Sequence, residues 1–319
     1  MKRFRYRNAT AITEAVALLQ EGNAAVLAGG TDILNLLKMS ALKNPPETLV
    51  NIKNIPGLNF IRRDEDQDSL KIGATTKVGD LASSELIKSK YPALASAAGS
   101  VASPPIRAMG TIAGNLCQEV QCWYFRRSFL TGNTFDCARK GGTQCYAVDG
   151  DNRYHAILGA KRCFAVCPSD IAVVLAALDA TIVTSKRNIP VADFYQVHGN
   201  VLECGEIITE IWLPAPDPRT HPVFIKYALR PTIDFAMASV AVSVTKELGK
   251  ALDARIVLGA VAPVPFRATL AEKALKGNTI SEPVAEMAAA AAVEDAIPLS
   301  RNKYKVPIVR ALVKRAILA

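Results

Sequence analysis

The feature that most constrains the fold is a stretch from about residue 118 to 166 that follows neither helical nor strand periodicity. Cys122, Cys137 and Cys145 lie in it among glycines, arginines and aromatic residues, whereas the flanking sequence is apolar and regular. Irregular loops of this length are uncommon in compact domains unless they have a function. The cysteines are the residues that would explain an ordered loop here.

Disulfide bonds do not explain these cysteines. The chain has seven Cys, an odd number, and its N-terminus lacks the apolar segment of a secretory signal because Glu14 interrupts it. We therefore expect a reducing, cytoplasmic location. No apolar run reaches the roughly 20 residues that span a bilayer, so no membrane insertion is expected. A small buried apolar role suits Cys204 and Cys117.

The charge pattern argues against nucleic acid as a partner. Lys and Arg total 38 against 29 Asp and Glu, and the positive charges are spread rather than gathered in a block. An acidic cofactor or an acidic protein partner accounts equally well for this excess.

The order of apolar segments predicts an α+β protein. Short strand and helix patterns alternate over residues 1–55, which predicts a small parallel sheet. Antiparallel strands are expected around the polar turn at 64–68. A helix broken near Pro92 and a turn-rich segment at 103–115 are expected to follow.

The second half predicts a helix at 169–180, capped by Ser169 or Asp170, then a succession of strands and two final helices. Prolines crowd a polar stretch at 214–222. We place a domain boundary there, giving domains of 1–218 and 219–319, with the first divided into about 1–55 and 56–218.

Two glycine turns are candidates for binding phosphate. Ala28–Asp32 and Gly110–Asn115 would let backbone N–H groups approach an anion, and together they could close over one pyrophosphate from opposite sides. Neither matches the dinucleotide or Walker fingerprints. A purely structural turn explains Ala28–Asp32 equally well.

The cysteine spacing favours a cubane iron–sulfur cluster over zinc. Fourteen residues separate Cys122 from Cys137, seven separate Cys137 from Cys145, and no C-x-x-C pair typical of zinc is present. Arg126, Arg127, Arg139 and Lys140 would offset the charge of the thiolates. For the fourth ligand, the residues alone leave Cys163, Cys167 and Cys117 open.

Together these motifs resemble a known family. AGGTDIL, TIAGN and the run from CWYFRRS through DCARKGG and QCYAVDGDNRYHAILG to PSD resemble the FAD-binding subunit of molybdenum hydroxylases, across essentially the whole chain. This family includes the medium subunits of xanthine dehydrogenase and CO dehydrogenase. The cysteine insertion resembles the branch with an additional [4Fe-4S] cluster, which includes aldehyde oxidoreductases and 4-hydroxybenzoyl-CoA reductase.

The resemblance implies a two-subdomain FAD-binding domain of the vanillyl-alcohol oxidase type over 1–218, with the [4Fe-4S] insertion at about 118–166. A C-terminal domain like that of the CO dehydrogenase flavoprotein, with an antiparallel sheet and a helical bundle, would cover 219–319. The residues implied to hold the FAD pyrophosphate and ribityl chain are Ala25, Val26, Leu27, Ala28, Gly29, Gly30, Thr31, Asp32, Ile33, Leu34, Thr111, Gly114 and Asn115.

Two further residues are implied at the flavin end, each with an ordinary alternative. Asp170 would bind the ribityl or flavin portion, and its alternative role is a helix cap. Lys226 would contact flavin, and its alternative is an exposed strand lysine.

The resemblance also separates the candidates for the fourth cluster ligand. It implies Cys122, Cys137, Cys145 and Cys163, with Cys167 as the competitor. In aldehyde oxidoreductases a Cys matches position 163, whereas the residue before PSD, which is Cys167 here, is usually His. The 4-hydroxybenzoyl-CoA reductase type has its last Cys near Tyr154, where this chain has none.

By resemblance, the chain is an oxidoreductase subunit for electron transfer in a heterotrimer, and no residue is assigned as a catalytic acid or base. A large subunit would carry the molybdenum cofactor and a small one [2Fe-2S] clusters, with an external carrier such as ferredoxin. A signal on a partner could export the complex. The alternatives are a stand-alone FAD-dependent oxidoreductase and a zinc-stabilised interaction scaffold.

Overall fold

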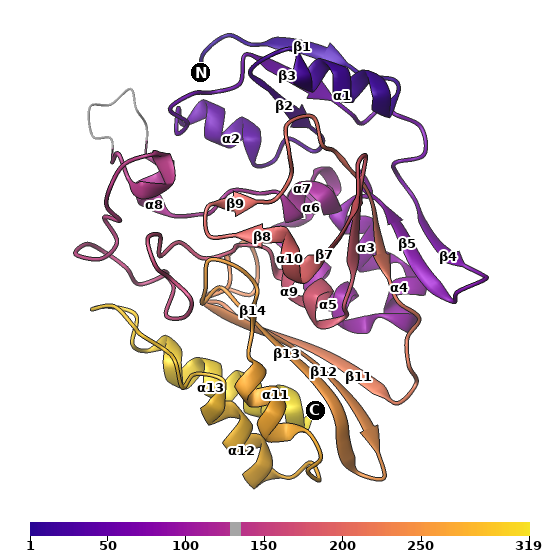
Figure 1. The fold of residues 1–319 in the computed structure, drawn as a ribbon, viewed down its shortest axis with the longest axis vertical. Helices are drawn as coiled ribbons and strands as arrows, with labels where there is room; N and C mark the ends of the chain where they lie inside the picture. The colour runs from indigo at the N-terminus through magenta and orange to yellow at the C-terminus, as the bar shows by residue number, and fades with distance from the viewer. Residues whose placement is uncertain (128–134) are drawn as a thin grey trace.

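The fold is three layers stacked along the long axis of the molecule (Figure 1). We describe it from a computed structural model, which covers residues 1–127 and 135–319. The part of the predicted insertion from 128 to 134 lies outside the described residues.

The first layer is a parallel sheet of three short strands in the order β1-β3-β2. Its elements are β1 (Arg5–Asn8), α1 (Ile12–Gln20), β2 (Ala24–Leu27), α2 (Ile33–Lys38) and β3 (Thr48–Asn51). The central strand β3 is buried along its whole length, as expected for a parallel sheet covered on its faces. The predicted parallel sheet of the first 55 residues is therefore confirmed.

The second layer is an antiparallel sheet in the order β4-β5-β10-β6-β7. Its strands are β4 (Ile61–Asp64), β5 (Ser69–Gly73), β6 (Thr181–Thr184), β7 (Asn188–Pro190) and β10 (Ile208–Leu213). The helices of this layer are α3 (Val78–Ser83), α4 (Glu85–Lys90), α5 (Pro92–Ser100), α6 (Pro104–Met109), α7 (Ile112–Leu116) and α9 (Asp170–Ala177). Sheet and helices share one large apolar core.

Two predictions for this layer need correction. The helix at 78–100 breaks at Ser84 as well as before Pro92, because the Ser84 hydroxyl accepts from the N–H of Ile87 and begins a new helix. The segment 103–115 is not turn-rich but forms α6 and α7. Prolines are tolerated at the first helical positions of α6, and Thr111 caps α7.

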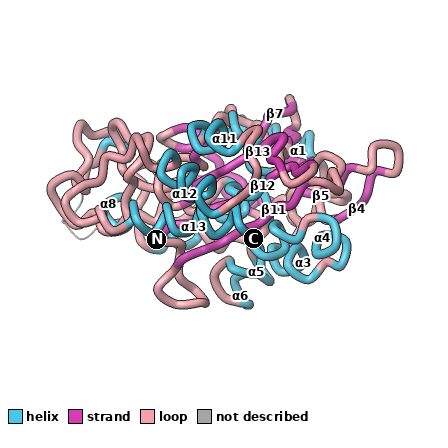
Figure 2. Tube along the Cα trace, turned by 90° about the horizontal axis from the view of Figure 1, so that it is seen from below, coloured by secondary structure: helices cyan, strands magenta, loops and turns pink. Residues whose placement is uncertain are grey.

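The third layer is an antiparallel sheet with helices on both faces. Its strands are β11 (Thr220–Tyr227), β12 (Ala238–Glu247), β13 (Lys250–Gly259) and β14 (Phe266–Arg267), followed by α11 (Thr269–Leu275), α12 (Glu282–Ala291) and α13 (Lys305–Leu318). The view from below shows these three helices in front of the sheet (Figure 2). From the second layer, α5 and α9 contact the same sheet, so the two layers share an apolar boundary.

The irregular segment of about residues 118–166, called the cysteine stretch below, lies beside the three layers. Its described part contains little regular structure. Its only described elements are α8 (Trp123–Arg126) and a 3₁₀ helix (Ala138–Lys140). A hairpin of β8 (Tyr195–Gln196) and β9 (Gly199–Asn200), preceded by α10 (Val191–Phe194), lies nearby. Cys137 and Cys163 pack with Leu36 of α2 and with Phe125 in a small separate core. Part of the described stretch therefore packs against the first layer.

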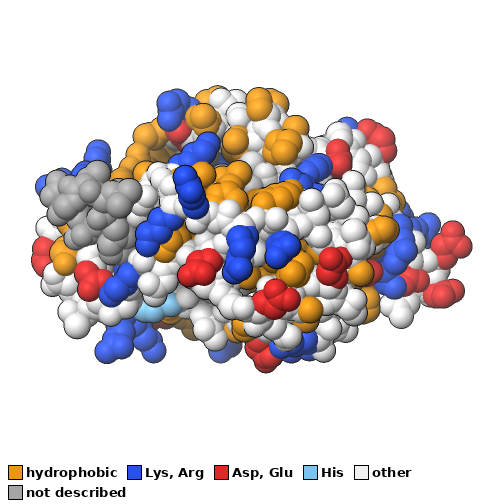
Figure 3. Space-filling model, turned by 90° about the horizontal axis from the view of Figure 1, so that it is seen from above, with side chains coloured by type: hydrophobic (Ala, Val, Ile, Leu, Met, Phe, Trp, Pro, Cys, Tyr) orange, Lys and Arg blue, Asp and Glu red, His pale blue; other side chains and the backbone are white. Residues whose placement is uncertain are grey.

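The surface agrees with the charge pattern of the sequence. On the face seen from above, Lys and Arg side chains are interspersed with acidic and apolar ones and form no continuous stripe (Figure 3). Among the described residues, no helix combines the length and apolar character that a bilayer crossing would require.

One core residue of the third layer is a lysine. Lys305, the first residue of α13, is fully buried, and its Nζ donates to the carbonyl oxygen of Ala260 at 2.7 Å. Burial lowers the pKa of Lys305 to about 7, with no opposing contribution from a carboxylate among residues 1–127 and 135–319. The C-terminal domain therefore contains a desolvated amine that lowers its free energy of unfolding, most of all at and below about pH 7.

We predict that Lys305→Met raises the free energy of unfolding at pH 7 by about 1–4 kcal/mol, because it removes this desolvation. The wild-type amine has a pKa of about 7 when folded and near 10.4 when unfolded. Since the unfolded chain binds more protons between these values, wild-type stability rises with pH across this window and the advantage of Met shrinks toward pH 10. Denaturant unfolding at about pH 7 and about pH 10 measures the difference in unfolding free energy between the variant and the wild type. Lys303→Met, at an exposed position, is the control. The same pH dependence of the unfolding free energy in Lys305→Met and in the wild type would contradict the prediction.

Candidate functional site

The two glycine turns meet in space, although about 80 residues separate them in the sequence. Gly29 packs directly against the backbone of Met109 and Gly110, so closely that a Cβ at Gly29 would clash with the Met109 carbonyl oxygen. Gly30 has a φ of +73°, in the left-handed region that favours glycine. The fold therefore favours glycine at these positions, whatever the turns bind.

A cavity of about 290 Å³ opens beside this contact. Of the residues predicted to hold FAD, those lining it are Ala25, Val26, Ala28, Gly29, Gly30, Thr31, Asp32, Ile33, Thr111 and Gly114. Leu27 and Leu34 do not line it, and both pack in an apolar cluster of the first layer. The structure thus brings most of this predicted set to one cavity.

Asp32 has a structural role in addition to lining this cavity. Its Oδ1 pairs with Nη2 of Arg126 at 2.6 Å, and its Oδ2 accepts from the backbone N–H of Glu119 at 2.8 Å. Arg126 is buried and also donates to the carbonyl oxygen of Val120. The carboxylate therefore anchors the start of the cysteine stretch to the first glycine turn.

A second cavity of about 350 Å³ shares Thr31, Asp32, Thr111 and Gly114 with the first. It is also lined by three more of the predicted residues, Asn115, Asp170 and Lys226. Asn115 Oδ1 accepts from the hydroxyl of Ser169 at 2.6 Å, so its orientation is set by the cap of α9.

Asp170 and Lys226 form a buried ion pair in this second cavity. Lys226 Nζ lies 2.8 Å from Asp170 Oδ2 and also donates to the carbonyl oxygen of Ser100, while Ser239 donates to Asp170 Oδ1. Ser169, not Asp170, caps α9 through its hydroxyl. The helix-cap alternative for Asp170 and the exposed-lysine alternative for Lys226 are therefore both wrong.

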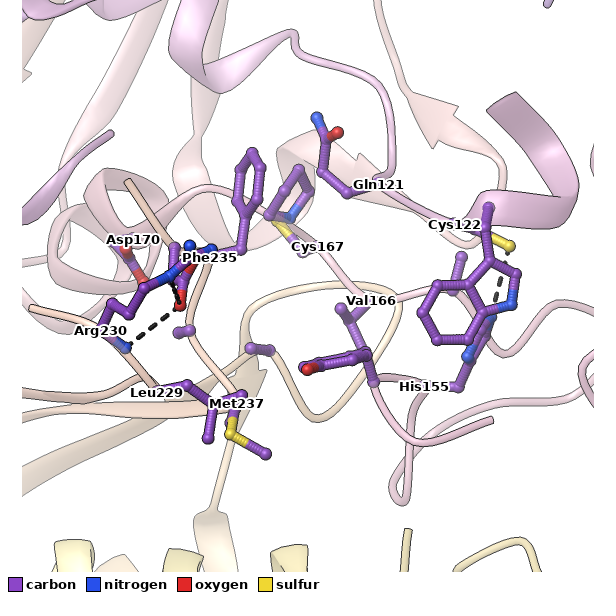
Figure 4. A pocket seen from close by; sticks show the side chains of 17 residues that line it. Gln121, Cys122, His155, Val166, Cys167, Asp170, Leu229, Arg230, Phe235 and Met237 are labelled. Carbon is purple, nitrogen blue, oxygen red and sulfur yellow. Dashed lines mark hydrogen bonds and ion pairs between the residues drawn. The ribbon is translucent and has the colours of Figure 1, made fainter. Parts of the chain in front are cut away.

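A third cavity, of about 500 Å³, shares Asp170 and Phe235 with the second. Figure 4 shows Asp170 and Arg230 at one end of it and Cys122 with His155 at the other. The rest of its lining is mainly apolar and aromatic. The three cavities thus form a series from the glycine turns to the cysteine stretch.

The four predicted cluster ligands line one small pocket. Cys122, Cys137, Cys145 and Cys163 surround it together with Phe125, Tyr124, Arg139 and other residues of the stretch. Cys167 does not line it; that thiol is buried between the third cavity and a separate small pocket. Cys122 lines both the small pocket and the third cavity.

Of these four cysteines, Cys137 and Cys163 are buried and Cys122 and Cys145 are half-buried. Burial raises the pKa of Cys122 to about 12 and also raises the pKa of Cys163, where nearby Arg139 acts in the opposite direction. Within residues 1–127 and 135–319, no group of three or more Cys, His, Asp or Glu side chains is arranged to hold a metal ion. The other two cysteines differ from expectation, since Cys117 and Cys204 are exposed rather than buried.

Sequence reasoning missed three residues that shape these cavities. Phe235, in the loop between β11 and β12, lines the second and third cavities, and Gln121 also lines both.

The loop that carries Phe235 has a strained backbone. Ile233 has a φ of +69° and donates its N–H to the carbonyl oxygen of Ala102, which itself has a φ of +43°. A β-branched residue at positive φ is a genuine outlier and indicates a loop held in place by its surroundings.

Besides Phe235 and Gln121, the third missed residue is His155. It is 2% exposed, and its Nε2 lies 3.3 Å from Sγ of Cys122. Burial, with a smaller contribution from Lys305, lowers its pKa to about 4, so the imidazole is neutral near pH 7. Nothing in the local sequence singles it out except that it is the only His in the stretch.

Comparison with known proteins connects this geometry to a family. Residues 2–216 match the FAD binding domain in molybdopterin dehydrogenase, and residues 224–319 match the CO dehydrogenase flavoprotein C-terminal domain. Over 288 residues the chain is 33% identical to the aldehyde oxidoreductase FAD-binding subunit PaoB of Escherichia coli K12, covering 86% of each protein. It is 25% identical to the xanthine dehydrogenase FAD-binding subunit of Escherichia coli O157:H7, covering 98% of this chain and 94% of that one.

The fold comparison agrees. A chain of carbon monoxide dehydrogenase from Hydrogenophaga pseudoflava superposes with a TM-score of 0.79 at 29% identity, covering 100% of this chain and 97% of that one. The predicted α+β fold with a flavoprotein C-terminal domain is thereby confirmed, whereas the [4Fe-4S] branch stays a prediction. The chain belongs to the family of FAD-binding medium subunits of the molybdenum hydroxylases and CO dehydrogenases.

Proposed function

We propose that this chain is the electron-transfer subunit of a multi-subunit molybdenum hydroxylase and that it carries FAD and a [4Fe-4S] cluster. The observation that carries the proposal is the position of Cys122. This residue lines both the pocket shared by the four cysteines and the series of cavities that begins at the glycine turns. A flavin in that series and a cluster in that pocket would be neighbours.

The residues around the cavities suit an extended dinucleotide. Residues of both glycine turns line the first two cavities, where backbone N–H groups could bind a pyrophosphate, and Thr111 and Gly114 line both. Asp170 and Lys226 offer an acceptor and a donor where the ribityl chain and ring would pass. The mainly apolar third cavity suits a planar ring system.

The donor set of the small pocket suits a cubane cluster better than a single ion. One zinc ion needs its thiolates about 2.3 Å from a common centre, and no such group is found among the described residues. In a [4Fe-4S] cluster each thiolate binds a different iron atom, so four sulfurs can line a pocket without converging on one point. Arg139 at this pocket would offset the negative charge.

In this proposal the protein supplies binding, spacing and electrostatics. FAD and the cluster, when bound, supply the electron-transfer chemistry. The chain's own residues would orient the flavin with the Asp170–Lys226 pair and exclude water with the aromatic residues around Cys122. No general acid or base is assigned, because electron transfer needs none.

The assembly is proposed from the family. One relative is named a carbon monoxide dehydrogenase medium chain and another a complex subunit, so this chain would act beside other subunits. We propose a large molybdenum-cofactor subunit, a small [2Fe-2S] subunit and an external carrier such as ferredoxin. We further propose a cytoplasmic location, unless a partner's signal exports the complex, and FAD-binding and C-terminal domains of 1–218 and 219–319.

The direct test is an anaerobic absorption spectrum of the purified chain with iron, sulfide, zinc and flavin analysis. We expect a flavin spectrum over a broad iron–sulfur shoulder, with about four irons per chain. Flavin without iron would contradict the cluster, and zinc without flavin would contradict the whole proposal.

For the flavin site we predict that Gly29→Ala weakens FAD binding roughly tenfold, because the new methyl group forces the two glycine turns apart at a cost of about 1–3 kcal/mol. Gly99→Ala is the matched control, since a Cβ there meets only ordinary contacts inside α5. Flavin fluorescence titration of the apoprotein measures both. Equal FAD affinity in the two variants would exclude a role for this contact in binding.

For the cluster we predict that Cys163→Ser lowers the iron content well below four per chain, whereas Cys167→Ser keeps about four. The physical reason is that only Cys163 lines the pocket with the other three cysteines. Both thiols are buried, so the two variants are comparable in their effect on packing. Iron loss only in Cys167→Ser would reverse the assignment.

A further inference from the structure

His155 is the buried group next to the cysteine pocket that the proposed function does not use. Its Nε2 lies 3.3 Å from Cys122 Sγ, within hydrogen-bond reach for sulfur. Its ring packs edge-on against Trp123, with centroids 5.5 Å apart, and lies 6.0 Å from the ring of Tyr124. Figure 4 shows the imidazole and the Cys122 thiol facing one another at the end of the third cavity.

The backbone at His155 is held by the C-terminal domain. Asn302, fully buried just before α13, donates from Nδ2 to the carbonyl oxygens of His155 and Ala156, each at 3.1 Å. Asn152 donates to Ser300 Oγ and accepts from the N–H of Arg301. Two buried asparagines therefore fix this turn of the cysteine stretch against the third layer.

The surroundings select one tautomer of the imidazole. A neutral imidazole carries one N–H, and His155 Nδ1 is buried with no hydrogen-bond partner among the described residues. A proton on Nδ1 would leave a buried donor unsatisfied and would turn the Nε2 lone pair toward the sulfur of Cys122. A proton on Nε2 gives the sulfur a donor and leaves only a bare lone pair at Nδ1.

We propose that His155 is a positioning residue that donates a hydrogen bond from Nε2 to the thiolate of Cys122 and so raises the reduction potential of the bound cluster. The inference rests on the proposed function, because it requires Cys122 to be a cluster ligand. Hydrogen bonds to cluster sulfurs stabilise the additional negative charge of the reduced state. Of the four proposed ligands, Cys122 is the one that also lines the third cavity, so the effect acts on the ligand shared with the proposed flavin site.

The test is an EPR-monitored redox titration of the full chain and of His155→Phe, which keeps an aromatic ring but has no N–H. In His155→Phe we expect the midpoint potential to be about 59 mV lower than in the wild type, for a one-electron couple. At the wild-type midpoint potential the ratio of reduced to oxidised cluster would then be about tenfold lower. His155→Gln, which offers an amide N–H, should recover part of this shift. His221→Phe, the same change at an exposed position on β11, should leave the midpoint unchanged.

An unchanged midpoint in His155→Phe with full iron content would overturn the inference. If that variant loses its cluster, the wild-type chain decides the question. With ¹⁵N-labelled histidine, pulsed EPR of the reduced cluster should detect one nitrogen coupling and one exchangeable proton, and the absence of both would reject the hydrogen bond. A wild-type chain without iron would reject the proposed function together with this inference.

Discussion

The buried ion pair between Asp170 and Lys226 joins the parts of the molecule on which the candidate site depends. Asp170 begins α9 in the second layer, Lys226 lies on β11 in the third, and Lys226 also binds the last residue of α5. Removing one partner of such a pair leaves a buried charge and typically costs about 3–5 kcal/mol. The pair therefore fixes how the C-terminal sheet meets the helices, and with it the wall of the second and third cavities.

A second set of contacts orders the cysteine stretch without regular secondary structure. Arg126 ties its start to Asp32, and Arg139 binds Glu119 and the carbonyl oxygen of Val197. Asn302 holds its later part from the C-terminal domain. Because these contacts come from the first layer, the β8–β9 hairpin and the third layer, the four thiols stay in one pocket although the described chain between them has little regular structure.

The same arrangement underlies the proposal that a flavin and a cluster bind next to one another. The series of cavities runs from the contact of the glycine turns, past Asp170, to Cys122. Apolar and aromatic side chains dominate its last part, which lowers the local dielectric and strengthens each hydrogen bond made there. Small changes in donors next to Cys122 would therefore have large effects on a redox group.

The sequence by itself determined the local elements whose signals are short-range. Alternating apolar segments predicted the parallel sheet, Ser169 or Asp170 marked the start of α9, and the glycine turns and cysteines marked the residues that line the cavities and the small pocket. Only the tertiary structure decided that Gly29 contacts Met109, that Asp170 pairs with Lys226 rather than capping its helix, and that Cys163 rather than Cys167 lies with the other cysteines. These relations join residues distant in sequence, and packing of separate layers sets them, so no local pattern encodes them.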